Sequence, residues 1–125
     1  MDKPSPANRQ NNEDLPVFVK WMDFLEWLLP VLEKFPKRVR FTFCDRMTEL
    51  ALDIVEDLVE ARYSARRREH LRQVNLRLEK LRVLLRICHR LQYLDHKRYE
   101  HAMTAINEVG RMIGGWLKQS GNGAA

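Results

Sequence analysis

The residues of this 125-residue chain whose chemistry stands out are basic, and they gather in one segment. Between Arg62 and Arg90 there are ten Lys/Arg against two acids, a local charge of +8. The whole chain carries only +5, so the remaining residues sum to −3. Positive side chains at this density repel one another unless anions neutralise them, so the pattern favours anion binding. A solvated charged face is the alternative.

The same segment has the pattern of a long amphipathic helix. Apolar residues at alternating spacings of three and four share one face: Leu71, Val74, Leu78, Leu81, Leu85 and Cys88. Guanidinium groups on another, roughly continuous stripe would repeat about every 5–6 Å, a spacing that matches successive phosphates, so nucleic acid is the first candidate. The predicted binding residues are Arg68, Arg72, Arg77, Lys80, Arg82, Arg86 and Arg90.

Other kinds of chemistry lack the residue patterns that they need. The four histidines show no paired-ligand spacing, so surface or capping roles are expected and neither a metal nor a cofactor is predicted. No Gly-rich phosphate loop, nucleophile elbow or Cys/His pair is visible, so no catalytic residue is predicted and we expect a protein that is not an enzyme. A small helical enzyme of the chorismate mutase type is the weaker alternative. Such an enzyme needs its basic residues inside an enclosed cavity, whereas the basic residues of this chain lie mostly off the apolar faces, on an outward stripe.

Four helices are predicted, over residues 15–34, 37–63, 66–91 and 95–118, with Asp95 as a cap of the last. Residues 1–14 and 119–125 are small or polar and are expected to be flexible tails. Helices of this length with short links predict an all-α, antiparallel up-down four-helix bundle. Cys44 and Cys88 then lie at a similar height as buried thiols, and a disulfide between them is the alternative. Gly110 and Gly114 would permit close approach of a neighbouring helix.

The first predicted helix carries apolar residues around most of its circumference. Such a helix is usually buried on more than one side, which indicates a subunit interface in a homo-oligomer. The predicted interface residues are Trp21, Phe24, Trp27 and Leu28. The alternative is that these large side chains only fill a small core. The most apolar run, 15–32, is interrupted by three charges and the chain does not begin with a secretory signal pattern, so a cytoplasmic protein that does not span a membrane is expected.

Three segments resemble a known family in collinear order. They are FPKRVRFTFCDRMTELALDIVEDLVEARYS (35–64), LRLEKLRVLLRICHRLQYLDHKRYEHA (76–102) and INEVGRMIGGWLK (106–118). The combination of the FPK turn, the EARY helix end, the LRLEKLR block and the GGWLK terminus resembles Avd, the accessory variability determinant protein of diversity-generating retroelements. More distantly, the chain is similar to the four-helix proteins encoded in ribosomal-RNA intervening sequences.

The resemblance implies a basic four-helix subunit that forms a barrel-shaped homopentamer without a catalytic site of its own. It also implies that the partners are a reverse transcriptase and nucleic acid, either RNA or DNA, during the mutagenic copying of template RNA. A scaffold whose basic face meets only an acidic protein stays open as the alternative, since both partners attract guanidinium groups.

Overall fold

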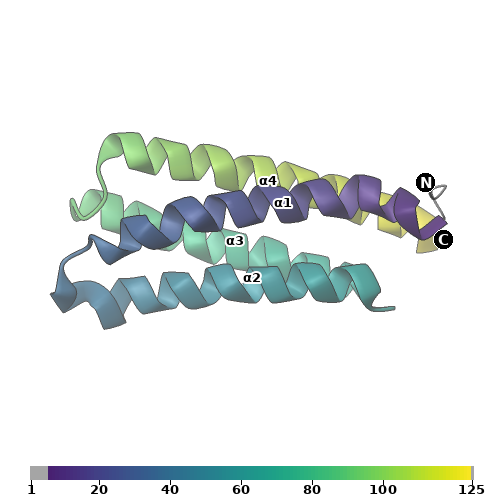
Figure 1. The fold of residues 1–125 in the computed structure, drawn as a ribbon, viewed down its shortest axis with the longest axis horizontal. Helices are drawn as coiled ribbons and strands as arrows, with labels where there is room; N and C mark the ends of the chain where they lie inside the picture. The colour runs from purple at the N-terminus through teal and green to yellow at the C-terminus, as the bar shows by residue number, and fades with distance from the viewer. Residues whose placement is uncertain (1–5, 125) are drawn as a thin grey trace.

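The computed structural model describes the backbone of residues 6–124 and the side chains of residues 15–121. Within this range the chain forms four α-helices and no strand: α1 (Pro6–Glu33), α2 (Asp45–Tyr63), α3 (Arg67–Arg90) and α4 (His96–Ala124). The helices run up and down along one long axis (Figure 1). The α1–α2 and α3–α4 connections lie at one end, and the α2–α3 turn lies at the other. The prediction of an all-α four-helix bundle is confirmed for the single chain.

Both outer helices extend beyond their predicted ends. α1 begins at Pro6 and α4 continues to Ala124, so residues 6–14 and 119–124, which the sequence predicts as tails, have helical backbone in the structure. Residues 1–5 and 125 lie outside the described residues. Extending an existing helix adds a hydrogen bond per residue without a new nucleus, so polar sequence next to a packed helix can stay helical. Pro16 and Pro30 both lie inside α1.

The connection from α1 to α2 is a corner made of two short helical turns. A 3₁₀ turn, η1 (Lys37–Val39), follows Pro36, and a π-helical turn, η2 (Arg40–Cys44), leads into α2. The backbone N–H of Asp45 bonds to the carbonyl of Arg40, five residues earlier. The predicted single helix over 37–63 is therefore regular only from Asp45, although its end at Tyr63 is confirmed. Such π turns are rare and occur often at functional sites.

The other two connections are tight turns closed by local hydrogen bonds. Between α2 and α3, the N–H of Arg66 donates to Ser64 Oγ at 2.9 Å. After α3, Gln92 takes a positive φ of 68°, and the N–H of Tyr93 reaches back to the carbonyl of Cys88 at 2.9 Å. Asp95 caps α4 as predicted, because its Oδ1 accepts from the N–H of Arg98 at 2.8 Å.

The core runs along the axis of the bundle and takes side chains from all four helices. Trp21, Phe24 and Leu28 belong to it, and Trp21 also donates from Nε1 to the carbonyl of Ala51 at 3.0 Å. These three residues are buried within a single chain, so their assignment to a subunit interface is wrong. α1 needs apolar residues on several sides because it packs against both α2 and α4. Trp27 is half-buried, and the centre of its ring lies 4.4 Å from the centre of the His101 ring.

Gly110, Gly114 and Gly115 of α4 do not serve close helix approach. A methyl group placed at Gly114 or Gly115 would meet no other element within 4 Å, and one at Gly110 would meet only Arg82 Nη2, at 3.9 Å. The expectation for Gly110 and Gly114 is therefore wrong. No helix among the described residues is long and apolar enough to span a membrane.

Candidate nucleic-acid interface

α3 fixes the direction of the basic side chains through its buried face. The six apolar residues predicted to share that face are all buried: Leu71, Val74, Leu78, Leu81, Leu85 and Cys88. They pack in the common core between α2 and α4. Because the backbone of a helix is rigid, the remaining positions of α3 point to the flanks of α2 and α4 or outward to solvent. The register of the predicted basic helix is therefore correct.

Three of the seven predicted binding residues make bonds inside the chain. Arg68 donates from Nη1 to the carbonyl of Leu117 at 2.7 Å, which ties α3 to α4. Arg82 donates from Nη2 to Asn107 Oδ1 at 2.9 Å and pairs with Glu79 at 2.7 Å. The third is Arg77, which pairs with two carboxylates of α2. The positive charge of these groups is partly used in holding the helices together.

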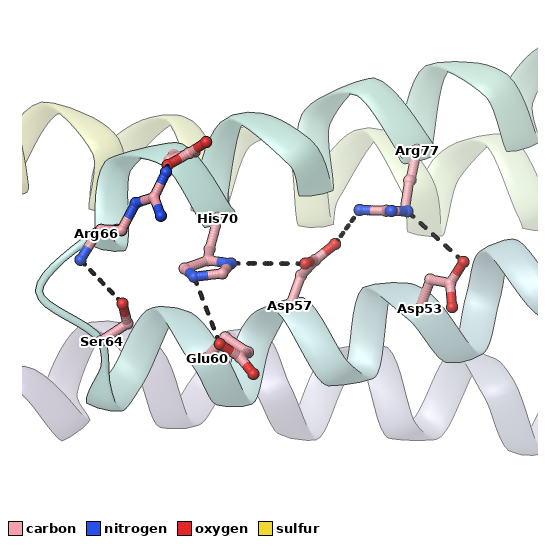
Figure 2. Close-up of polar contacts among 8 residues, drawn as sticks. Asp53, Asp57, Glu60, Ser64, Arg66, His70 and Arg77 are labelled. Carbon is pink, nitrogen blue, oxygen red and sulfur yellow. Dashed lines mark hydrogen bonds and ion pairs between the residues drawn. The ribbon is translucent and has the colours of Figure 1, made fainter.

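Arg77 belongs to a polar network between α2 and α3 that Figure 2 shows. Its Nη1 bonds to Asp57 Oδ2, and its Nε lies 3.7 Å from Asp53 Oδ2. On the other side of Asp57, His70 places Nδ1 3.7 Å from Asp57 Oδ1 and Nε2 3.5 Å from Glu60 Oε2. The side chain of Asp57 is only 14% exposed, so its charge depends on these neighbours. The network holds the two helices in register beside their turn.

The other four predicted residues, Arg72, Lys80, Arg86 and Arg90, are exposed. Within residues 15–121 none of the four has an ion pair or a side-chain hydrogen bond. Arg72, Arg86 and Arg90 are separated by 14 and 4 residues, spacings that return to the same helix face, with rises of about 21 Å and about 6 Å. Lys80 lies on another face, where it lines a groove between α2 and α3. The exposed basic stripe is thus interrupted where Arg82 turns to α4.

A second group of exposed cations lies at the corner between α1 and α2, and the sequence-based site prediction missed it. Lys37, Arg38 and Arg40 are exposed there, next to the exposed ring of Phe41. The available signal was the run from Lys34 to Cys44, which contains four Lys/Arg and no acid. Its total charge is small beside that of α3, so a search by charge excess finds α3 first.

The two cysteines of the chain lie in the core. Cys44 and Cys88 are free and buried, so the expectation of buried thiols is confirmed. Burial raises the pKa of the Cys44 thiol, and burial together with the nearby Cys44 raises the pKa of Cys88 to about 12. Both thiols therefore stay protonated and unreactive at neutral pH. Among the described residues, no three His, Cys, Asp or Glu come together in a way that could hold a metal ion.

Comparison with known proteins adds the decisive observation. The model of a family described as bAvd-like matches residues 17–120, which includes nearly all of the bundle. The chain belongs to the bAvd-like family. A search of curated proteins finds no match, and neither does a search of solved structures. For this bAvd-like protein, the matched range contains both the exposed cations of α3 and the corner at Lys37–Cys44.

Proposed function

We propose that this bAvd-like protein is a non-catalytic accessory protein of a diversity-generating retroelement, acting in the cytoplasm. In this proposal it binds nucleic acid, as template RNA or cDNA, together with the reverse transcriptase that copies it. Membership of the family supports the role. The observation that carries nucleic-acid binding is the set of three exposed arginines, Arg72, Arg86 and Arg90, that share one face of α3 without a carboxylate partner among the described residues.

The mechanism is electrostatic positioning. Each exposed guanidinium that neutralises a phosphate releases a counterion, so binding weakens steeply with salt and carries no base specificity by itself. Three contacts on one chain are weak. Several copies held together would multiply them, since each further contact becomes intramolecular. A protein of this kind can hold a template near the polymerase without taking part in the chemistry.

The test removes the three charges without disturbing the bundle. Each phosphate contact contributes about −0.7 to −0.9 to the slope of log affinity against log salt. Replacing Arg72, Arg86 and Arg90 by Gln should therefore make this slope shallower by about 2–3 per chain. Over a fourfold change in salt, this slope change alters relative affinity about 20- to 40-fold. The assay is fluorescence anisotropy with a structured RNA. Arg111→Gln is the control, because it removes one exposed charge from α4.

The triple variant distinguishes nucleic-acid binding from binding to an acidic protein surface. An unchanged slope in the triple variant would refute the assignment of these arginines to nucleic acid. If the variant kept full RNA affinity but no longer bound the reverse transcriptase, the exposed arginines would serve an acidic protein surface instead. Circular dichroism should show unchanged helicity, since exposed substitutions of this kind typically change stability by less than about 0.5 kcal/mol.

We further propose that the protein self-associates into a ring, with the homopentamer favoured, through apolar surfaces other than the predicted one. α3 exposes Leu76 and Val83, each about half exposed at 50%, seven residues apart on one face. They line the groove between α2 and α3, whose volume is about 580 Å³. A second exposed apolar row lies on α1, at Leu15, Val19 and Met22. Two different apolar surfaces on one chain suit head-to-tail contacts, which form a ring when the rotation between neighbouring copies closes.

Val83→Glu tests this assembly. A charge at the centre of the groove should break head-to-tail contacts and leave the 14.9 kDa chain as a monomer in light scattering. The wild type should have the mass of five copies. Gln73→Glu provides the matched control, because it adds the same charge at an exposed polar position of α3. An unchanged mass for Val83→Glu would show that this groove lies outside the contact.

A further inference from the structure

The most exposed large apolar side chain described in the structure is Phe41, at 80% of its full accessible surface. It lies in the π-helical turn η2, at the end of the bundle where α1 turns into α2 (Figure 1). Its neighbours Val39 and Cys44 are buried and anchor the turn in the core. The ring of Phe41 therefore stands on a fixed piece of backbone and contributes little to folding. A rigid, exposed aromatic ring is a surface on which a flat ligand can stack.

Three cations precede this ring in the sequence, and the run from Lys34 to Cys44 contains no acid. Lys37, Arg38 and Arg40 are exposed, and within residues 15–121 none has a carboxylate partner. Arg38 is held in place, because its guanidinium carbon lies 5.8 Å from the centre of the Tyr93 ring. Tyr93 in turn packs against Phe43 at 6.1 Å between ring centres. The corner thus combines an exposed ring with three positive charges, of which one has a fixed position.

The corner also lies at the same end of the bundle as the last exposed arginine of α3. Arg90 ends α3, and Tyr93, three residues later in the α3–α4 turn, contacts Arg38 of the corner. Figure 1 shows both connections at that end. The last exposed arginine of α3 and the corner that carries Phe41 therefore lie at one end of the bundle.

We propose that the corner binds single-stranded nucleic acid, with Phe41 stacked on an unpaired base and Lys37, Arg38 and Arg40 on the flanking phosphates. Bases inside a duplex already stack on each other, so an exposed ring has access only to unpaired bases. Stacking on an aromatic side chain tolerates any base, which suits a protein without base-specific contacts. The inference rests on the proposed nucleic-acid binding and adds a second site that selects single strands over duplexes.

The experiment compares Phe41→Ala with the wild type in the full-length protein. Anisotropy is measured with a labelled, unstructured oligoribonucleotide and with a blunt duplex RNA of the same length. Phe41→Ala should weaken single-strand binding at least about fivefold, the lower limit for loss of one stacked base, and leave duplex binding unchanged. Phe41→Trp should keep or increase single-strand affinity, since indole stacks at least as well. Tyr63→Ala is the matched control, because Tyr63 is 77% exposed at the other end of α2.

The outcomes separate this inference from the proposed function. If the wild type binds both RNAs and Phe41→Ala binds each of them as tightly as the wild type does, the corner inference fails and nucleic-acid binding stands. An equal loss for both RNAs would also overturn it, because the ring would then not be selecting unpaired bases. If Phe41→Ala changes the oligomeric mass, or removes only reverse-transcriptase binding, the ring serves a protein contact. A wild type that binds neither RNA would overturn both proposals.

Discussion

Replacing Arg77 by Gln should destabilise the bundle and leave the salt dependence of nucleic-acid binding unchanged. The substitution removes the bond from Nη1 to Asp57 and the contact of Nε with Asp53 at 3.7 Å. Asp57, with only 14% of its side chain exposed, then keeps His70 Nδ1, at 3.7 Å, as its remaining side-chain neighbour in the network. Losing a hydrogen bond between charged groups costs about 1.5–3 kcal/mol, and partial solvent exposure places the expected value near the lower limit.

Urea unfolding followed by circular dichroism measures this cost. With a slope of about 2 kcal/mol per M, a loss of about 1.5 kcal/mol lowers the unfolding midpoint by about 0.8 M. Protein concentration must be held constant, because self-association adds to apparent stability. Arg72→Gln is the comparison, since Arg72 is exposed on the same helix, and its midpoint should stay within about 0.3 M of the wild type.

A double-mutant cycle with Asp57→Asn makes the reasoning refutable. If Arg77 and Asp57 act as a pair, the double variant should lose less stability than the sum of the single variants. Equal midpoints for Arg77→Gln and Arg72→Gln would refute a structural role for Arg77. So would a reduced salt slope in Arg77→Gln at unchanged stability, which would return Arg77 to the binding residues.

Two further predictions concern stability. Gly114→Ala and Gly115→Ala should each raise the free energy of unfolding by up to about 1 kcal/mol, since both positions are exposed inside α4 and an added methyl meets nothing; a lower thermal midpoint would show that they face a partner chain. Folding raises the pKa of the Cys88 thiol to about 12, against 9.0 in the unfolded chain. The contribution of this thiol to the stability of the folded protein is therefore complete below pH 9 and is progressively lost as the pH rises toward 12. Unfolding free energy should fall over this window, and less so in Cys88→Ala; equal pH dependence in both proteins would contradict the role of Cys88.

Hydrophobic periodicity was sufficient to predict the four helices and the buried face of α3. Those features depend on neighbours three and four residues apart, which the sequence displays directly. The helix ends at Pro6 and Ala124 were missed because polar composition predicts tails, whereas a helix already packed can extend at little cost.

The division of the basic residues could not be predicted from the sequence. Arg68, Arg77 and Arg82 find their partners 49, 20 and 25 residues away, at Leu117, Asp57 and Asn107. Only the arrangement of the helices brings those groups together. For the same reason Trp21 and Leu28 were assigned to an interface, because the sequence does not show that α1 packs against two neighbours.

The most direct test of the central claim, that this protein holds nucleic acid through exposed cations, is the affinity of the wild type for a structured RNA across a salt series. The account predicts a linear fall of log affinity with log salt, with a slope of at least about −2 per chain from Arg72, Arg86 and Arg90. An affinity that does not depend on salt, or no binding at about 50 mM salt, would contradict it.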